Sequence, residues 1–221
     1  MVKVKKILSK NQIAILKKIG SNNFLTDNFY LTGGTALAAF YLEHRYSEDL
    51  DFFSEKEIDV LSLDIFFKQI KKDIEIKKID FQQSYNRNLF FIHFDDEIIK
   101  TEFTFFPFPP LEKPEKEERL KIDSILDIAV NKLFTIYQRT KARDYIDLYF
   151  ICREKGYSLG ELKKKARIKF DWHIDPIQLG NQFNKAVEAE DYPKMVTSIE
   201  NLDWQTFFIE EAKKLKPEIL E

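Results

Sequence analysis

The sequence predicts an α+β fold, with a small mixed sheet in the N-terminal half and only helices in the C-terminal half. The runs that read as strands all lie in the first half. The cluster Phe106-Pro-Phe-Pro-Pro110 ends the last of these runs, because proline cannot continue a strand ladder. From Ser124 onward, apolar residues recur at helical spacing. We therefore expect two regions, residues 1–110 and 111–221.

The N-terminal region begins with a helix that Ser9 caps and Gly20 ends. Alternating apolar runs, bounded by turn-forming residues, then predict the strands of the sheet. We expect strands at 30–31, 49–53, 74–82, 88–94 and 98–106, helices at 35–44 and 61–72, and a charged connector at 111–119.

The C-terminal region is predicted to contain helices at 127–139, 143–155, 159–169, 176–189, 192–199 and 204–215. Ser124 is placed to cap the first of them. The basic run 163–169 carries five cations, but no aromatic side chain interrupts it. A solvated helix face is therefore favoured there over an RNA contact.

Composition limits the classes of partner. The chain has 221 residues and a formal net charge of −2, so an RNA partner has to meet a local basic patch instead of a uniformly positive surface. The one cysteine, Cys152, excludes an intrachain disulfide and fits a reducing compartment. No apolar run approaches the ~18 residues of a membrane span. We expect a cytoplasmic protein with no membrane segment.

A glycine pair stands where a short apolar strand meets a helix. Gly33-Gly34 follows Tyr30-Leu31 and precedes Thr35 and a run of good helix formers. Glycine lets the backbone turn sharply and approach a ligand closely. A helix N-terminus offers free N–H groups and the positive end of a dipole, which suits phosphate. A plain loop with a threonine cap has the same pattern, so the pair gains meaning only from its neighbours.

Two aspartates follow on one side of a predicted strand. Asp49 and Asp51 are two residues apart and therefore point the same way, with Leu50 and Phe52 on the opposite side. Neighbouring carboxylates repel one another unless a cation lies between them. Mg²⁺ binds a few carboxylates together with water and substrate phosphates. This pattern predicts a site for Mg²⁺ or Mn²⁺, and a solvated strand end is the alternative.

A third acid is expected on a neighbouring strand. Alternation in the run 98–106 places Lys100, Glu102 and Thr104 on one side of a strand. A carboxylate among β-forming residues is disfavoured without a functional reason. Glu102 is therefore the predicted third metal ligand and catalytic acid with Asp49 and Asp51. Its alternative interpretation is an exposed charge on an edge strand.

These motifs resemble those of the nucleotidyltransferases of the polymerase-β superfold, and more narrowly those of the AbiEii/AbiGii abortive-infection toxins. The resemblance rests on Gly33-Gly34-Thr35-Ala-Leu37 and on Arg45-x-Ser47-x-Asp49-Leu-Asp51-Phe52. It implies a nucleotidyltransferase core, a nucleoside triphosphate as substrate, and nucleotide contacts by the glycine turn and Arg45. Many members of the superfold have Gly-Ser where this chain has Gly-Gly, so Thr35 and Ser47 both remain candidates for the hydroxyl that meets phosphate.

Two helices of the C-terminal region carry further charges that resemble the toxin family. By this resemblance, Lys132 contacts the triphosphate and Arg143 the nucleotide. Asp144 is implied to lie near the reacting group, as a base or an orienting acid. Asp144 and Asp147 share a helix face, and Asp147 is expected to pair with Arg143 or Lys141 and hold the helix in place.

Residues and resemblance together predict an enzyme that moves a nucleoside monophosphate from an NTP to an acceptor hydroxyl and releases pyrophosphate. The resemblance implies an RNA acceptor, the 3′ end of tRNA, and a toxin restrained by a cognate antitoxin. One alternative is an acceptor hydroxyl on a protein or small molecule. Another is an inactive domain that binds nucleotide or RNA, against which the complete set of three acids argues.

Overall fold

The computed structural model describes residues 7–220, and the chain divides into two compact units. The first comprises the described residues up to Phe40, together with Ser47–Pro109 and Lys113–Ser124. The second comprises Tyr41–Tyr46, Pro110–Glu112 and the described residues from Ile125 onward. Residues 113–124 thus group with the sheet, whereas the sequence assigned them to the helical region.

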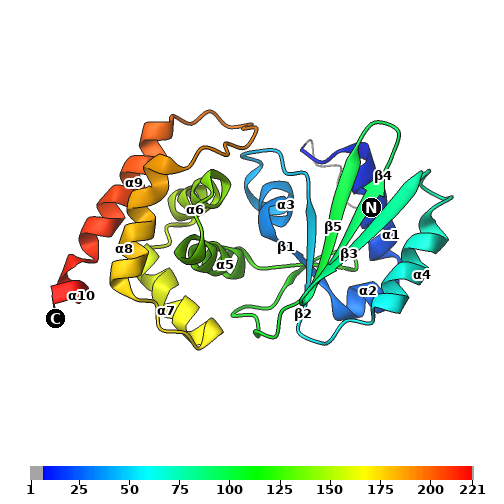
Figure 1. Cartoon of the computed structure of the whole chain (residues 1–221), viewed down its shortest axis with the longest axis horizontal. Coiled ribbons are helices and arrows are strands. Elements are labelled where there is room, and N and C mark those ends of the chain that lie inside the picture. The colour runs from blue at the N-terminus through cyan, green and yellow to red at the C-terminus, as the bar shows by residue number, and fades with distance from the viewer. Residues whose placement is uncertain (1–6, 221) are drawn as a thin grey trace. The chain divides into compact units, whose positions relative to one another are not determined.

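One mixed sheet forms the centre of the first unit (Figure 1). Its strands are β1 (Tyr30–Thr32), β2 (Leu50–Ser54), β3 (Lys78–Ser84), β4 (Arg87–His93), β5 (Ile98–Phe105), β6 (Glu115–Glu117) and β7 (Leu120–Ile122). Their order is β3-β4-β5-β2-β1-β7-β6. The pairs β2·β5 and β1·β7 are parallel, and the other neighbours are antiparallel. The predicted α+β class with a mixed sheet is confirmed.

The helices of the first unit are α1 (Lys10–Gly20), α2 (Asn23–Asn28), α3 (Gly33–Leu37) and α4 (Val60–Ile70). Aromatic side chains of β2, β4 and β5 bury one sheet face against α4. Phe103 stacks on Phe52 with ring centroids 5.1 Å apart, and Phe67 of α4 lies 4.5 Å from Phe90. Alternation along the strands consequently turns the charged residues of β2 and β5 to the opposite face.

The first unit positions the segment before β2 through a buried amide of α1. Ser9 and Gln12 form a reciprocal capping box, which confirms the predicted start of this helix. The Gln12 side chain also donates hydrogen bonds of 2.9 and 3.0 Å to the carbonyl oxygens of Ser47 and Glu48. The backbone that leads into Asp49 is thereby fixed from a helix that lies more than thirty residues earlier in the chain.

The predicted connector at 111–119 is wrong in its second part. Residues 115–117 and 120–122 form a hairpin whose inner strand, β7, extends the sheet beside β1. Leu120 and Ile122 are buried, so the short run alternates as a half-buried strand does. Charged residues dominate the outer strand, as is usual at a sheet edge. Because of these charges, composition predicted a connector here instead of a hairpin.

The second unit is helical throughout most of its described length (Figure 1). Its helices are α5 (Ile125–Gln138), α6 (Ala142–Lys155), α7 (Leu159–Phe170), α8 (Pro176–Asn184), α9 (Asn201–Lys214) and α10 (Lys216–Leu220), with a 3₁₀ turn at Lys185–Glu188. Trp204 and Phe208 of α9 pack on Tyr145 of α6, with ring centroids 6.0 and 4.9 Å apart. These aromatic contacts lie in the core of the unit, together with buried aliphatic side chains of α5 to α8.

Other local predictions also differ from the structure, among them the strand expected at 74–82, which begins only at Lys78. Residues 192–199 are not helical, because Tyr192 and Val196 are half exposed and no apolar stripe is buried there. The helix expected at 35–44 is α3 followed by a π-helix at Ala38–Leu42. In the basic run 163–169, Lys169 is buried against Asp127 at 2.6 Å, so this run is only in part a solvated face.

In the part of the chain that the structure describes, no helix combines the length and apolar character that crossing a membrane requires.

Replacing Gln12 with Met is expected to lower the free energy of unfolding by ~1–3 kcal/mol, because two partly buried carbonyl groups lose their donor. Urea unfolding followed by circular dichroism measures the change. Lys17→Gln, at an exposed position of the same helix, serves as the control and should stay within about 0.5 kcal/mol of the wild type. Equal stability of Gln12→Met and wild type would contradict the anchoring role.

Candidate active site

The glycine turn brings backbone against a carboxylate. Strand β1 ends at Thr32, and α3 begins at Gly33, whose φ of +72° lies in the left-handed region that favours glycine. A methyl group at Gly33 would lie 2.8 Å from Oδ2 of Asp51. Gly33 is therefore required both by its conformation and by the close approach of Asp51, whereas Gly34 does not share this positive φ.

The two candidate hydroxyls have different surroundings. The Thr35 hydroxyl is buried and donates a hydrogen bond to the backbone carbonyl of Asp49. It ties the start of α3 to the entry of β2. Ser47 is half buried, and its carbonyl accepts the Gln12 amide. The phosphate contacts predicted for these two residues stay predictions.

The three predicted acids share one face of the sheet. Asp51 on β2 is the register partner of Glu102 on the parallel strand β5. Asp49 directly precedes β2 and lies two residues from Asp51, while Leu50 and Phe52 are fully buried on the other side. We call Asp49, Asp51 and Glu102 the acid face. The structure thus brings together the acids that the sequence grouped.

Two cations, Lys100 and Arg87, accompany the acid face. Lys100 Nζ lies 2.7 Å from Oδ2 of Asp49 and 4.0 Å from Oε2 of Glu102. The Arg87 guanidinium makes two hydrogen bonds, of 2.6 and 2.7 Å, with the two carboxylate oxygens of Glu102. Sequence reasoning placed Lys100 on this side of β5 but missed Arg87. The hairpin register of β4 and β5, which sets Arg87 opposite Thr104, is the information that identifies it.

These cations keep Glu102 ionised. Burial by itself raises the pKa of this carboxyl, but hydrogen bonds from Arg87 and Thr104 and the charges of Arg87 and Lys100 outweigh burial and lower it. The hydrogen bond with Glu102 in turn raises the pKa of Arg87. Glu102 is consequently a carboxylate at neutral pH.

The oxygen atoms of the acid face are ligands of the kind that a hard divalent cation binds. Carboxylate oxygens are the ligands that Mg²⁺ prefers, and this ion usually takes one or two of them beside substrate phosphates. The Lys100 ammonium already places a positive charge between Asp49 and Glu102. Within residues 7–220, however, no three His, Cys, Asp or Glu side chains are arranged to hold a metal ion. The fit is therefore to Asp49 and Asp51, with Glu102 engaged by Arg87.

The sheet face stays open beyond the acid face. Phe91 on β4 is the register partner of Lys100, and it lines a hollow of ≈ 560 Å³ together with Lys78 and His93. This hollow extends to the edge strand β3. Lys100 therefore lies between the acid face on one side and an accessible surface on the other.

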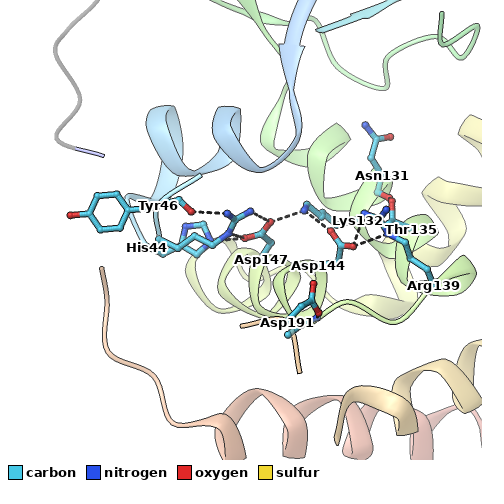
Figure 2. Close-up of polar contacts among 11 residues, drawn as sticks. His44, Tyr46, Asn131, Lys132, Thr135, Arg139, Asp144, Asp147 and Asp191 are labelled. Carbon is cyan, nitrogen blue, oxygen red and sulfur yellow. Dashed lines mark hydrogen bonds and ion pairs between the residues drawn. The ribbon is translucent and has the colours of Figure 1, made fainter. Parts of the chain in front are cut away.

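The second unit contains a separate cluster of charges centred on Asp147 (Figure 2). The Asp147 side chain is fully buried. Its Oδ1 accepts a 2.6 Å hydrogen bond from Nε of Arg45 and lies 2.8 Å from Nε2 of His44. Its Oδ2 lies 2.8 Å from the Arg45 terminal nitrogen and 2.6 Å from Nζ of Lys132. The expected pairing of Asp147 with Arg143 or Lys141 is wrong, because Asp147 faces the interior and Arg143 faces solvent.

Lys132 and Asp144 extend this cluster along α5 and α6. Lys132 Nζ donates a 2.7 Å hydrogen bond to Asp144 Oδ1, and Arg139 donates 3.0 and 3.2 Å bonds to Asp144 Oδ2. Lys132 and Asp144 are both buried, and Arg143 is exposed. The structure therefore joins Lys132 with Asp144 and leaves Arg143 outside the cluster.

Burial and charge act in opposite directions within the cluster. Burial raises the pKa of Asp147, but the charges of Arg45 and Lys132 and hydrogen bonds from Arg45 and His44 lower it well below its usual value. For Lys132, burial lowers the pKa, and the carboxylates of Asp144 and Asp147 raise it. The pKa of Asp144 is lowered, because Lys132 and Arg139 outweigh burial. Asp144, Asp147 and Lys132 are therefore charged at neutral pH.

The geometry gives Arg45 and His44 structural roles. Arg45 engages Asp147 with two nitrogens and the Tyr46 carbonyl with a third. His44 is buried beside Phe150 of α6, with ring centroids 5.1 Å apart. The nucleotide contact predicted for Arg45 stays a prediction. Arg139 and His44 had no pattern in the sequence that marked them as partners of α6.

A glycine turn beside an Asp-x-Asp strand, with a third acid on the next strand, defines the nucleotidyltransferase class. Solved structures agree on the fold. A candidate nucleotidyltransferase from H. pylori matches with a TM-score of 0.62 and 24% identity, covering 97% of this chain and 99% of its own. JHP933 from Helicobacter pylori matches with a TM-score of 0.61 and 24% identity, covering 96% and 94%.

The chain belongs to the family of AbiEii nucleotidyltransferase toxins of type IV toxin–antitoxin systems, whose family model matches residues 14–216. A relative from Aquifex aeolicus (strain VF5), the uncharacterized protein aq_aa25, is 37% identical over 167 residues. That alignment spans 74% of this chain and 76% of the relative. The protein is accordingly a nucleotidyltransferase of this toxin family.

Replacing Gly33 with Ala is expected to destabilise the first unit by ~1–3 kcal/mol, because alanine is strained at a positive φ, and to displace the Asp51 carboxylate. Gly156→Ala is a matched control. Gly156 has φ +71°, but a methyl group there meets nothing within 4 Å. Nucleotidyl transfer should fall in Gly33→Ala and persist in Gly156→Ala; equal activities would refute the contact with Asp51.

Replacing Asp147 with Asn is expected to lower the free energy of unfolding by about 3–5 kcal/mol at pH 7, because Arg45 and Lys132 lose a buried countercharge. The lowered pKa of Asp147 means that its contribution is present above the unfolded value of about 3.9 and is lost as pH falls through the lower folded value. Urea unfolding between pH 7 and 3 measures both effects.

The stability of wild type should therefore decline more steeply below pH 4 than that of Asp147→Asn. Asp171→Asn is the control, since Asp171 is exposed and its left-handed conformation (φ 46°) accepts asparagine. Parallel pH profiles for wild type and Asp147→Asn would contradict this assignment.

Proposed function

We propose that the protein transfers a nucleoside monophosphate from an NTP to an acceptor hydroxyl with the help of Mg²⁺ or Mn²⁺. The observation that carries this proposal is the acid face, where Asp51 and Glu102 stand side by side on parallel strands beside the Gly33 turn. Two neighbouring carboxylates repel one another, and a cation bound between them relieves this repulsion. Family membership supports the transfer of a nucleotidyl group.

Asp49 and Asp51 are the residues that would hold the metal, with Glu102 as the third acid beside them. When bound, the ion supplies charge neutralisation for the triphosphate and lowers the pKa of the attacking hydroxyl. In the transfer, the acceptor oxygen forms a bond to the α-phosphorus, the bond to the pyrophosphate oxygen breaks, and the hydroxyl proton is released. Positioning and electrostatics contribute most of the rate in such reactions.

The Gly33-Gly34 turn is assigned to the phosphates of the substrate. Because Gly33 has no Cβ atom, its backbone can approach Asp51 closely in the left-handed conformation. The contact of Lys132 with the triphosphate and the role of Asp144 near the reacting group are part of the same proposal. They rest on the family resemblance.

RNA is the proposed acceptor, through the hydroxyl at the 3′ end of tRNA, and the cellular role is that of a toxin held in check by a cognate antitoxin. Membership of a toxin family of type IV systems supports the toxin role. The formal net charge of −2 means that RNA binding depends on a local group of cations and is weakened by salt.

The proposal predicts that Asp51→Asn loses roughly a hundredfold or more of its transfer activity while the fold persists, since one strong electrostatic contact at the reaction centre is removed. Purified protein is incubated with each α-³²P-labelled NTP, Mg²⁺ and either total RNA or protein lysate. Asp64→Asn is the control, because Asp64 pairs with Lys68 on the exposed side of α4.

Label in RNA supports the proposed acceptor, whereas label in protein shifts the acceptor to a protein hydroxyl. Binding of nucleotide without transfer by wild type would favour an inactive binding domain. In cells, induced expression of wild type should slow growth and Asp49→Ala should restore it; equal growth of the two strains would count against the toxin role.

A further inference from the structure

We propose that Lys100 is a built-in counter-cation of the acid face, which leaves Asp49 when a divalent metal binds and then neutralises substrate phosphate. This inference rests on the proposed function, because it takes Asp49 and Asp51 as metal ligands. Its starting point is the position of the Lys100 ammonium, 2.7 Å from Asp49 and 4.0 Å from Glu102. A cation is thus already present among the carboxylates.

The charge balance explains why Lys100 is needed in the free protein. Asp49, Asp51 and Glu102 bring three negative charges to one sheet face. Repulsion by its neighbours destabilises the ionised form of each carboxylate. Arg87 and Lys100 supply two positive charges at hydrogen-bond distance. The acid face is therefore nearly neutral before any ligand binds. A divalent ion on the same carboxylates makes the local charge positive, and it repels the ammonium.

Geometry distinguishes Lys100 from Arg87 in this exchange. Arg87 holds both oxygens of Glu102 in a forked pair, which fixes the guanidinium and the carboxylate together. Lys100 has one hydrogen bond, to Asp49, and a longer contact with Glu102. An ammonium on a flexible stem is a compact point charge that moves by rotation about its own side-chain bonds. Lys100 is the cation that can leave without disturbing the sheet.

The surroundings leave room for that movement. The Lys100 and Asp49 side chains are 25% and 34% exposed, and the sheet face next to Lys100 opens into the hollow that Phe91 lines. Rotation of the ammonium away from Asp49 displaces no core side chain. The triphosphate that accompanies the metal supplies the negative charge that Lys100 then meets. The same lysine consequently serves the free and the loaded states.

The first test measures Mn²⁺ binding to the nucleotide-free protein by electron paramagnetic resonance of the free ion. Lys100→Met should bind Mn²⁺ about tenfold more tightly than wild type, since one partly screened positive charge is removed a few ångströms from the ion. Lys78→Met is the matched control. Lys78 lies on the same sheet face but pairs with Asp80 at 2.8 Å, and its substitution should leave Mn²⁺ affinity unchanged.

Asp49→Asn separates this inference from the proposed function. If Asp49→Asn and wild type bind Mn²⁺ alike, the metal role of Asp49 is wrong and the proposed function fails with it. If Asp49→Asn loses Mn²⁺ while Lys100→Met binds no more tightly than wild type, the metal site stands and the counter-cation role is overturned. Lys100→Arg, which keeps the charge, should retain wild-type affinity.

A second test needs no substitution and so does not depend on how a variant folds. Wild-type protein is treated briefly with an acylating reagent, and labelling of each lysine is read by peptide mass spectrometry. Labelling of Lys100 should rise several-fold when Mg²⁺ alone is added and fall when Mg²⁺ and a non-hydrolysable NTP are added together. Lys78 is the internal reference. Equal labelling of Lys100 in all three states would overturn the proposal.

Discussion

The helical unit depends on the ion pairs of one buried carboxylate, that of Asp147. Its oxygens are shared by Arg45, His44 and Lys132, which reach it from the segment before β2 and from α5. Neither the Asp147 carboxylate nor the cations of Arg45 and Lys132 can be left unpaired in a low-dielectric interior without a cost of several kcal/mol. The ion pairs therefore fix α6 against α5 and against the residues around Arg45. The aromatic side chains of the core pack against helices held in this arrangement.

The acid face uses the same residue types to a different end. Asp49 and Lys100 also form an ion pair, but both remain accessible to water, and such a pair contributes only about 0–1 kcal/mol. Its geometry is thus easily changed by a ligand. Burial, and not the kind of residue, separates the charges that hold this protein together from those that are available for binding. A lysine beside an aspartate has no single meaning until its exposure is known.

Local rules in the sequence were sufficient for the acid face and insufficient for its partners. Alternation along strands placed Asp49, Asp51 and Glu102 on one side, and the structure confirms that side. Arg87 reaches Glu102 only through the register of a hairpin, and Arg45 reaches Asp147 across 102 residues. The pairing expected for Asp147 failed because helix-spacing rules describe exposed faces. The hairpin at β6 and β7 was missed because three-residue strands with charged neighbours carry little periodicity.

The anchoring of the Ser47–Glu48 backbone by Gln12 has a genetic consequence. Reading a nucleotidyltransferase for inactivating changes usually means examining its charged residues. Here an uncharged amide in the first helix fixes the entry to the aspartate strand, and a glycine without a side chain sets the space beside Asp51. Inactivating substitutions in this enzyme are accordingly not limited to the residues that carry out the reaction. Natural alleles that keep every acid can therefore still encode an inactive protein.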